Sequence, residues 1–209
     1  MYNFTFNIPT KIHFGKDTIS SLSELKAYGS KVLLVYGGGS IKKNGLYDTA
    51  MKILKDAGLT VFELSGVEPN PKIETVRKGV EICKNEGIDM VLAIGGGSTI
   101  DCSKVVAAGA KYDGDAWDLV LDGSKVKAAL PIFDVLTLSA TGTEMDPFAV
   151  ISDMSKNEKW GTGSPYMVPT MSILNPEYTF SVSKKQTAAG TADMMSHTME
   201  NYFSMENAD

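Results

Sequence analysis

Residues 90–101 read MVLAIGGGSTID, an apolar run that passes through three glycines into the start of an amphipathic stretch. The apolar run predicts a buried strand, and the stretch TIDCSKVVAAGAKY over 99–112 predicts a helix that covers one face of a sheet. A strand that leads through glycines into a helix is the first half of a βαβ unit, and such units build parallel sheets. We therefore predict an α/β fold with a Rossmann-like parallel sheet flanked by helices.

The same alternation continues on both sides of this segment. Residues 31–40, KVLLVYGGGS, repeat the strand and glycine loop, and residues 73–87 carry the apolar spacing of a helix. Two apolar runs, 131–138 and 168–174, predict further strands. The remaining predicted elements are a helix over 46–58 and a strand over 59–67.

The N-terminal residues depart from this pattern. Tyr2–Ile8 and Lys11–Phe14 alternate weakly around Pro9 and predict an antiparallel β-hairpin. An exposed hairpin offers an unpaired strand edge to another chain. We expect this edge to serve a homodimer.

After Pro176 the composition changes from β-branched residues to Ala, Met and Lys, and a helical region is expected from Ser183 onward. We divide the chain into a nucleotide-binding α/β domain at 1–178 and the beginning of a helical metal-binding domain at 179–209. About thirty residues are too few to bury a core of their own. We therefore expect the chain to be a truncated portion of a two-domain protein.

The composition excludes several classes of protein. The 209 residues are 43% hydrophobic and 22% charged, as in soluble globular proteins, and the net charge of −5 argues against a nucleic-acid partner. The sequence contains neither a signal peptide nor a run of about 20 apolar residues, so we expect a cytoplasmic protein without membrane contact. Cys83 and Cys102 are expected to be buried free thiols.

Both glycine loops are candidates for phosphate binding. The loop at Gly95–Gly97 opens a helix, whose N-terminal N–H groups favour an anion, and glycines let a phosphate approach the backbone. The alternative is a tight turn with Ser98 as N-cap. The loop at Gly37–Ser40 repeats the arrangement, with a plain turn as the alternative. Because open α/β sheets bind ligands at the carboxyl ends of their strands, two such loops favour a dinucleotide.

The loops also indicate which dinucleotide is bound. Neither matches the GxGxxG fingerprint, in which an acidic residue holds the ribose 2′-hydroxyl. Glycines and Ser40 stand after Val35 and Tyr36 instead, and Lys42 and Lys43 follow. An uncharged loop beside two lysines would accept a 2′-phosphate, which points to NADP rather than NAD.

Asp193 and His197 lie four residues apart in a sequence rich in Gly and Met. On a helix this spacing puts a carboxylate and an imidazole on one face, where both can bind a divalent metal, iron or zinc. A catalytic site takes three or four protein ligands. The other histidine, His13, lies far upstream and is interpreted as structural. The sequence therefore shows half of a metal site, and helix packing is the alternative interpretation of the methionines around it.

Two further segments are open to a functional or a structural interpretation. The loop Ser139–Glu144, SATGTE, offers hydroxyl groups and flexible backbone after a buried strand, and it equally suits a structural turn. Lys159 is interpreted on its local sequence as a solvated loop charge.

The motifs occur in a fixed order: GGGS after the strand at 31–35, PNP at 69–71, GGGSTID, LSATGTEM, ILNPEYT and AAGTADMMSHTMENYF. In that order the chain resembles the iron-containing alcohol dehydrogenases over its whole length, and the butanol dehydrogenase-like branch fits best. The resemblance implies an oxidoreductase with a nucleotide-binding domain, a helical domain, and a cofactor and divalent metal between them. It also implies hydride transfer between NADP(H) and an alcohol or aldehyde, with the metal polarising the substrate oxygen.

The resemblance carries over residue by residue. Asp193 and His197 match the first two metal ligands, which two histidines on later helices complete in the family. Gly39 matches the position where NAD-preferring relatives carry an aspartate. The positions that match the loop beside the adenosine ribose are Gly37, Gly38, Gly39 and Ser40. The positions that match the pyrophosphate and nicotinamide end are Asn70, Gly96, Gly97, Ser98, Asp101, Thr137, Leu138, Thr141 and Lys159.

Two other functions stay open. The chain by itself suits a catalytically silent nucleotide-binding module, because its metal site and substrate pocket are incomplete. The second is a sister enzyme with similar loops and a metal, such as a glycerol dehydrogenase or a dehydroquinate synthase-like protein. The segment MMSHTMENYF fits the alcohol dehydrogenases better.

Overall fold

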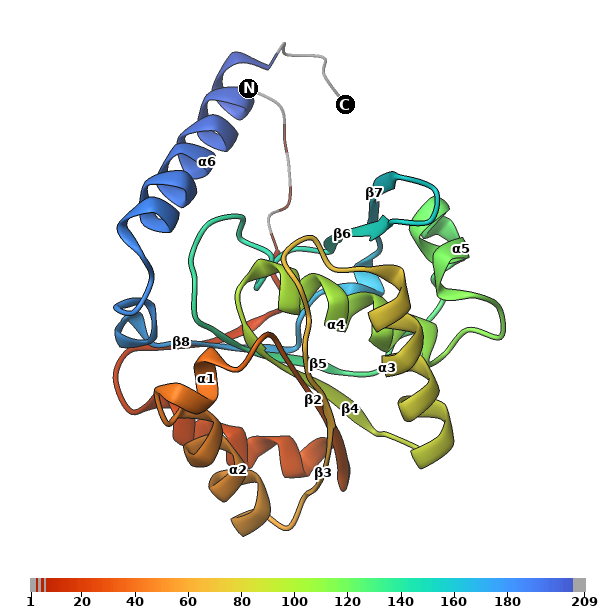
Figure 1. Cartoon of the computed structure of the whole chain (residues 1–209), viewed down its shortest axis with the longest axis vertical. Helices are drawn as coiled ribbons and strands as arrows, with labels where there is room; N and C mark the ends of the chain where they lie inside the picture. Colours follow the sequence, from red (N-terminus) through yellow and green to blue (C-terminus); the bar gives the residue numbers. More distant parts are fainter. Residues whose placement is uncertain (1–2, 4, 6, 205–209) are drawn as a thin grey trace.

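Six parallel strands form the central sheet of the computed structural model, which describes residues 3, 5 and 7–204 (Figure 1). Their order across the sheet is β1-β8-β5-β4-β2-β3. The parallel pairing of the strands at 31–36 and 90–95 confirms the predicted α/β fold. The strands of the sheet are β1 (Lys11–Phe14), β2 (Lys31–Tyr36), β3 (Thr60–Leu64), β4 (Met90–Gly95), β5 (Ile132–Leu136) and β8 (Met171–Leu174).

Helices cover both faces of this sheet (Figure 1). The α-helices are α1 (Ser40–Lys43), α2 (Leu46–Asp56), α3 (Ile73–Glu86), α4 (Gly97–Gly109), α5 (Ala116–Leu121) and α6 (Lys184–Phe203). The 3-10 helices are η1 (Thr18–Tyr28), η2 (Gly123–Lys125), η3 (Pro165–Met167) and η4 (Pro176–Thr179). In β2, Val32 and Leu34 pack with η1 and α2, whereas Leu33 and Val35 pack with α3 and α4. Because both faces of the strand are covered, its sequence is a continuous apolar run.

The first strand joins the sheet through a partner that the sequence does not indicate. β1 pairs in parallel with β8, with Lys11 opposite Met171. The antiparallel hairpin predicted for Tyr2–Ile8 and Lys11–Phe14 is corrected accordingly, and part of its first arm lies outside the described residues. An isolated hairpin is marginally stable in water, whereas the edge of a packed sheet offers a ladder that the core already orders.

A separate antiparallel ribbon consists of β6 (Phe148–Asp153) and β7 (Glu158–Gly163). Ala149 and Ile151 of this ribbon belong to the same core as α3 and α4. The sequence analysis does not predict the ribbon, because glycines at 161 and 163 weaken the strand pattern of β7.

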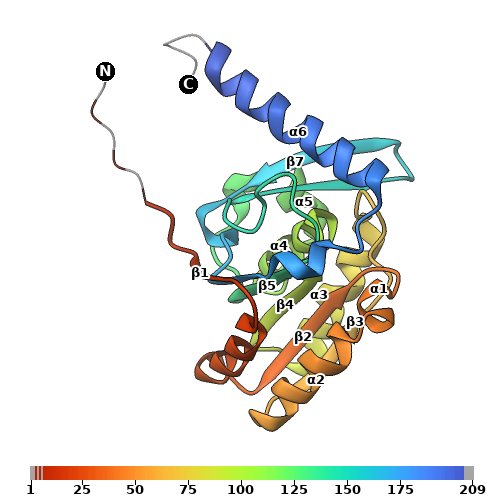
Figure 2. The ribbon, with the colours of Figure 1, turned by 90° about the vertical axis from the view of Figure 1, so that its left-hand side faces the viewer.

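The last helix begins where the sequence predicts. Ser183 is the N-cap of α6, and its hydroxyl oxygen accepts a 3.2 Å hydrogen bond from the backbone N–H of Gln186. The helix runs for 20 residues and extends away from the sheet (Figures 1 and 2); among its residues, all of them described, only Gly190 is buried. Neither α6 nor any other helix in the described part of the chain is long and apolar enough to cross a membrane.

Both cysteines are buried free thiols, as predicted. Burial raises the pKa of Cys83 and of Cys102 to about 12. Neither thiol therefore ionises at neutral pH, which makes both poor nucleophiles.

Candidate functional site

The glycine loop ahead of α4 forms the helix start directly. The helix begins at Gly97 with Gly96 as N-cap, and no side chain accepts a capping hydrogen bond. The alternative in which Ser98 is the N-cap is therefore wrong, because Ser98 lies in the first turn. The N–H groups of Thr99 and Ile100 donate to the carbonyl of Gly96, at 2.9 and 3.3 Å, so those of Gly97 and Ser98 are the ones that can bind an anion.

Close packing requires glycine in this loop. A Cβ atom at Gly97 would lie 3.3 Å from Oγ1 of Thr141, and one at Gly95 would lie 2.4 Å from Oγ1 of Thr99. A side chain at Gly97 would push the loop after β5 away from the start of α4, whereas one at Gly95 would clash with Thr99 in the first turn of the helix. Gly97 therefore lets the loop and the helix approach each other at the carboxyl edge of the sheet.

Two cavities at this edge bring the candidate residues together. One of about 160 Å³ lies over the start of α4, and one of about 250 Å³ joins the two glycine loops. The candidates that line the first cavity are Gly97, Ser98, Leu138 and Thr141. Those that line the second are Ser40, Gly96, Thr137 and Leu138.

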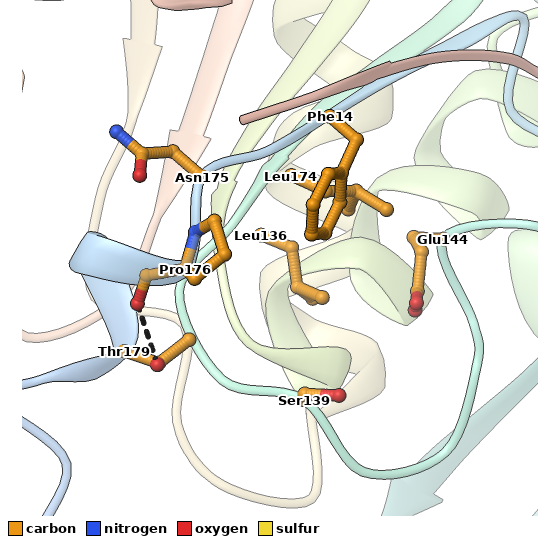
Figure 3. A pocket seen from close by; sticks show the side chains of 8 residues that line it. All are labelled: Phe14, Leu136, Ser139, Glu144, Leu174, Asn175, Pro176 and Thr179. Carbon is orange, nitrogen blue, oxygen red and sulfur yellow. Dashed lines mark hydrogen bonds between the residues drawn. The ribbon is translucent and has the colours of Figure 1, made fainter. Parts of the chain in front are cut away.

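A third cavity, of about 270 Å³, lies at the carboxyl ends of β5 and β8 (Figure 3). Phe14, Leu136 and Leu174 give it an apolar wall, and Glu144 contributes a carboxylate. The hydroxyl of Thr179 is engaged by a 2.7 Å hydrogen bond to the carbonyl oxygen of Pro176. Glu144 also lines the 160 Å³ cavity, so this side chain links the two spaces.

The loop after β2 leaves open space beside it. Gly39 has a φ of +98°, a conformation that favours glycine. A Cβ atom at Gly38 or Gly39 would meet no heavy atom of the described residues within 4 Å. A nucleotide could therefore approach this backbone closely.

Lys42 is held beside the same loop. Its Nζ lies 5.0 Å from the ring centre of Tyr36, 4.4 Å from that of Tyr47 and 3.9 Å from Oε2 of Glu63. Tyr36 and Tyr47 donate hydrogen bonds of 2.6 and 2.8 Å to Glu63, and the bond from Tyr36 is the main cause of its lowered pKa. Sequence analysis does not identify Glu63. The dinucleotide fingerprint places an acidic residue near the end of the strand that follows the glycine loop, and Glu63 has that place in β3.

Lys159 and Asn70 meet, although 89 positions separate them. The Lys159 ammonium donates a 2.7 Å hydrogen bond to Oδ1 of Asn70. Lys159 lies on β7 rather than in a loop, so its interpretation as a loop charge is corrected. The pair places a cation beside the turn that precedes α3.

A buried polar network fastens the loop at 139–147. Nζ of the fully buried Lys104 donates hydrogen bonds of 2.9 Å to Oγ1 of Thr143 and 2.8 Å to Oδ1 of Asp146. Thr143 donates to Asp101 at 2.6 Å, and the N–H of Val150 donates to the other oxygen of Asp101 at 3.0 Å. Burial lowers the pKa of Lys104 and raises that of Asp101. Both carboxylate oxygens of Asp101 are thus engaged in hydrogen bonds within the protein. The sequence signal that could have revealed this network is the single lysine in an otherwise apolar helix.

Asp193 and His197 lie on one face of α6, with Oδ1 and Nε2 3.6 Å apart and both side chains exposed. A carboxylate and an imidazole suit divalent iron or zinc, so the pair fits part of such a site. No group of three or more potential ligands occurs within the described residues. His13 instead has its Nδ1 3.1 Å from the hydroxyl of Ser21 and its Nε2 3.3 Å from Glu24, as befits a structural residue.

The iron-containing alcohol dehydrogenase family model matches residues 9–176. NADH-dependent butanol dehydrogenase A of Clostridium acetobutylicum is 62% identical over 98% of this chain and 53% of its own length. NADPH-dependent aldehyde reductase YqhD of Escherichia coli is 40% identical over 97% of this chain and 52% of its own length.

Among solved structures, NADH-dependent butanol dehydrogenase A of Thermotoga maritima superimposes with a TM-score of 0.94 at 49% identity, over 97% of this chain and 52% of its own. The chain spans about half the length of the curated relatives it matches. The order of the glycine loops, the parallel sheet and these matches all point to the same family. The chain belongs to the butanol dehydrogenase branch of the iron-containing alcohol dehydrogenase family.

Proposed function

We propose that the chain forms the nucleotide-binding portion of an oxidoreductase that transfers a hydride between NADP(H) and an alcohol or aldehyde. The observation that carries the proposal is the cavity on which the two glycine loops meet, with Ser40 from one and Gly96 from the other. Open α/β sheets bind dinucleotides at this edge. The names of the relatives indicate the substrates, butanol and aldehydes.

Each candidate residue takes a role from its place in the fold. The backbone N–H groups of Gly97 and Ser98 bind the pyrophosphate, because a helix N-terminus carries partial positive charge. The hydroxyl of Thr141 contacts the nicotinamide end of the cofactor. Lys159, oriented by Asn70, adds a charge-assisted hydrogen bond.

The choice between the two nicotinamide cofactors rests on the loop after β2. The open space at Gly39 leaves room for a 2′-phosphate, and Lys42 and Lys43 supply positive charge nearby. Butanol dehydrogenases A and B of Clostridium acetobutylicum, at 62% and 60% identity, are named NADH-dependent, whereas YqhD is named NADPH-dependent. We favour NADP(H) on the loop chemistry, with NADH as its competitor.

The metal-binding portion begins with α6. We keep the division into a nucleotide-binding domain at 1–178 and the start of a helical domain at 179–209. When bound, the nicotinamide carries the hydride and a divalent metal, iron or zinc, held in part by Asp193 and His197, polarises the substrate oxygen. The α/β portion holds the cofactor so that its nicotinamide faces the helical portion, because hydride transfer depends on the alignment of nicotinamide and substrate.

A second candidate function is a nucleotide-binding module without catalysis. The observation that favours it is that the described residues present two metal-ligand candidates, Asp193 and His197, and no larger group. We further propose a cytoplasmic location and a homodimer through the N-terminal edge of the sheet, where Ile12 and Phe14 of β1 are exposed.

The test is a titration of the 209-residue chain with NADPH and with NADH, followed by cofactor fluorescence, in the absence and presence of ferrous iron or zinc. Saturable binding that prefers NADPH supports the nucleotide site. Butanal-dependent oxidation of NADPH by the same sample would exclude the silent module. Failure to bind either cofactor would overturn the assignment of the glycine loops.

A further inference from the structure

The hydroxyl of Ser172 lies within hydrogen-bond distance of two oxygen atoms. Its Oγ is 2.6 Å from Oδ2 of Asp134 and 2.7 Å from the carbonyl oxygen of Glu144. A serine hydroxyl carries one proton, and a carbonyl oxygen only accepts. Both contacts are hydrogen bonds only if Asp134 itself carries a proton, so that Asp134 donates to Ser172 and Ser172 donates to Glu144.

Asp134 has the surroundings of a neutral acid. The residue lies on β5 with 0% of its surface exposed, and its Oδ1 has no hydrogen-bond partner within the described residues. Burial raises the pKa of Asp134 well above its ordinary value, and the nearby Glu144 carboxylate raises this pKa further. The hydrogen bond with Ser172 and the positive charge of Lys104 lower the pKa, but burial is the largest effect. The Lys104 ammonium is committed to hydrogen bonds with Thr143 and Asp146.

The protonation state of Asp134 determines where the Ser172 proton points. A neutral Asp134 leaves that proton for the carbonyl of Glu144. An ionised Asp134 would be the stronger acceptor and would take the proton, and the buried carbonyl would lose its partner. Glu144 lines the cavities of about 160 and 270 Å³, so the position of its backbone affects the shape of both.

We propose that Asp134 is a positioning residue that holds a proton at neutral pH and, through Ser172, fixes Glu144 and the loop at 139–146 for cofactor binding. The inference rests on the proposed function, because that loop is part of the proposed cofactor site. The loop is then held by Lys104 at Thr143 and Asp146 and by Ser172 at Glu144.

Infrared difference spectroscopy of the wild type against Asp134→Asn at pH 7 tests the proton. The carbonyl-stretching band of a protonated carboxylic acid is expected in the wild type and absent from the variant. A wild type without this band overturns the proposal. Should the variant not fold, the band is sought in Asp101→Asn protein with ¹³C-labelled aspartate carboxyl groups, which removes the other aspartate whose pKa burial raises. Absence of an isotope-shifted band there overturns the proposal.

The positioning role is tested by NADPH affinity at pH 7. Asp134→Asn is expected to bind within twofold of the wild type, because its amide also donates to Ser172, whereas Ser172→Ala is expected to bind at least fivefold more weakly. The matched control is Ser103→Ala, since Ser103 is equally buried and donates only a 2.8 Å hydrogen bond to the carbonyl of Thr99 in its own helix.

Two outcomes contradict the role of Asp134. Unchanged NADPH affinity in Ser172→Ala shows that the loop is positioned without Ser172. Tighter binding by Asp134→Asn shows that the wild-type residue is charged, since loss of a negative charge favours an anionic ligand. If the wild type binds neither cofactor, the proposed function fails, and the loop is then assessed by amide hydrogen exchange over 139–146, which Ser172→Ala is expected to accelerate.

Discussion

Lys159 on β7 and Asn70 ahead of α3 are joined by a 2.7 Å hydrogen bond across 89 positions of sequence. Asn70 has a φ of 54°, in the left-handed region that asparagine tolerates better than most residues. Close by, Lys72 forms a parallel bridge with Ser152, so the ribbon of β6 and β7 is attached to this turn twice. The ammonium of Lys159 is thereby held in a defined position.

Removing this ammonium should weaken cofactor binding. Lys159→Ala is expected to raise the Kd for NADPH about tenfold, equivalent to roughly 1.4 kcal/mol, because a charge-assisted hydrogen bond is lost. Fluorescence titration measures the Kd. Lys111→Ala serves as control, since this exposed lysine follows the C-terminal end of α4. Equal weakening in both variants would mean that only the overall charge matters.

A carboxylate at position 39 should reverse the cofactor preference. Gly39→Asp is expected to lower NADPH affinity at least about tenfold and to preserve that for NADH, because the carboxylate repels the 2′-phosphate and can accept from a ribose hydroxyl. The φ of +98° at this position strains any side chain. Gly39→Asn shares that strain without the charge, so equal selectivity of the two variants would contradict the electrostatic explanation.

Loss of the buried ammonium should destabilise the fold. Lys104→Met keeps the length of the side chain, but Oγ1 of Thr143 loses its ammonium donor and Oδ1 of Asp146 keeps only the backbone N–H of Phe148. A loss of about 3 kcal/mol in the free energy of unfolding is expected from urea denaturation. Lys111→Met, at an exposed position, should stay within about 0.5 kcal/mol of the wild type. A similar small change at both positions would show that the network adds little to stability.

The stability difference between Asp134→Asn and the wild type should depend on pH. Burial holds the folded-state pKa of Asp134 well above the ordinary value of an aspartate, so the folded state binds this proton more tightly than the unfolded state. Wild-type stability therefore falls as pH rises above about 4, by up to about 1.4 kcal/mol per pH unit for this group until the folded-state pKa is reached.

The variant has no such group, so it should be the more stable protein at pH 7, and the gap should close toward pH 4. Urea denaturation of both proteins at several pH values measures the gap. A gap of constant size across this range would show that Asp134 has the same pKa in both states.

The helix α6 should bind a divalent metal weakly and through one histidine. Zinc binding, measured by competition with a coloured chelator, is expected to be lost in His197→Ala, because the remaining Asp193 carboxylate is a single ligand. His13→Ala is the control, as His13 contacts Ser21 and Glu24 instead. Zinc binding as strong as that of a complete site would argue against the silent module.

The inner part of the fold follows from local sequence. β2 and β4 are apolar along their length because helices cover both faces, and the residues after each strand are glycines. The start of α6 at Ser183 is equally local, since an N-cap side chain acts within three residues. Such elements are predictable because their causes lie within a few residues of each other.

The partners of the outer elements are not encoded locally. The short run at Lys11–Phe14 predicts a strand, but its exposed side chains do not indicate which sheet edge it joins. In the candidate site, the glycine loops are evident from the sequence. The bond between Lys104 and Thr143 spans 39 positions and that between Ser172 and Asp134 spans 38, so only the folded chain brings those groups together.

The pairing of β1 with β8 has a consequence for synthesis of the protein. Phe14 is synthesised before β2 to β7, whereas its ladder partner Leu174 is synthesised only after all six of them. The nascent chain must therefore carry β1 without its ladder partner while β2 to β7 are made, a period in which open edges and apolar surface favour chaperone binding. The six-stranded sheet is therefore completed only after β8 has been synthesised.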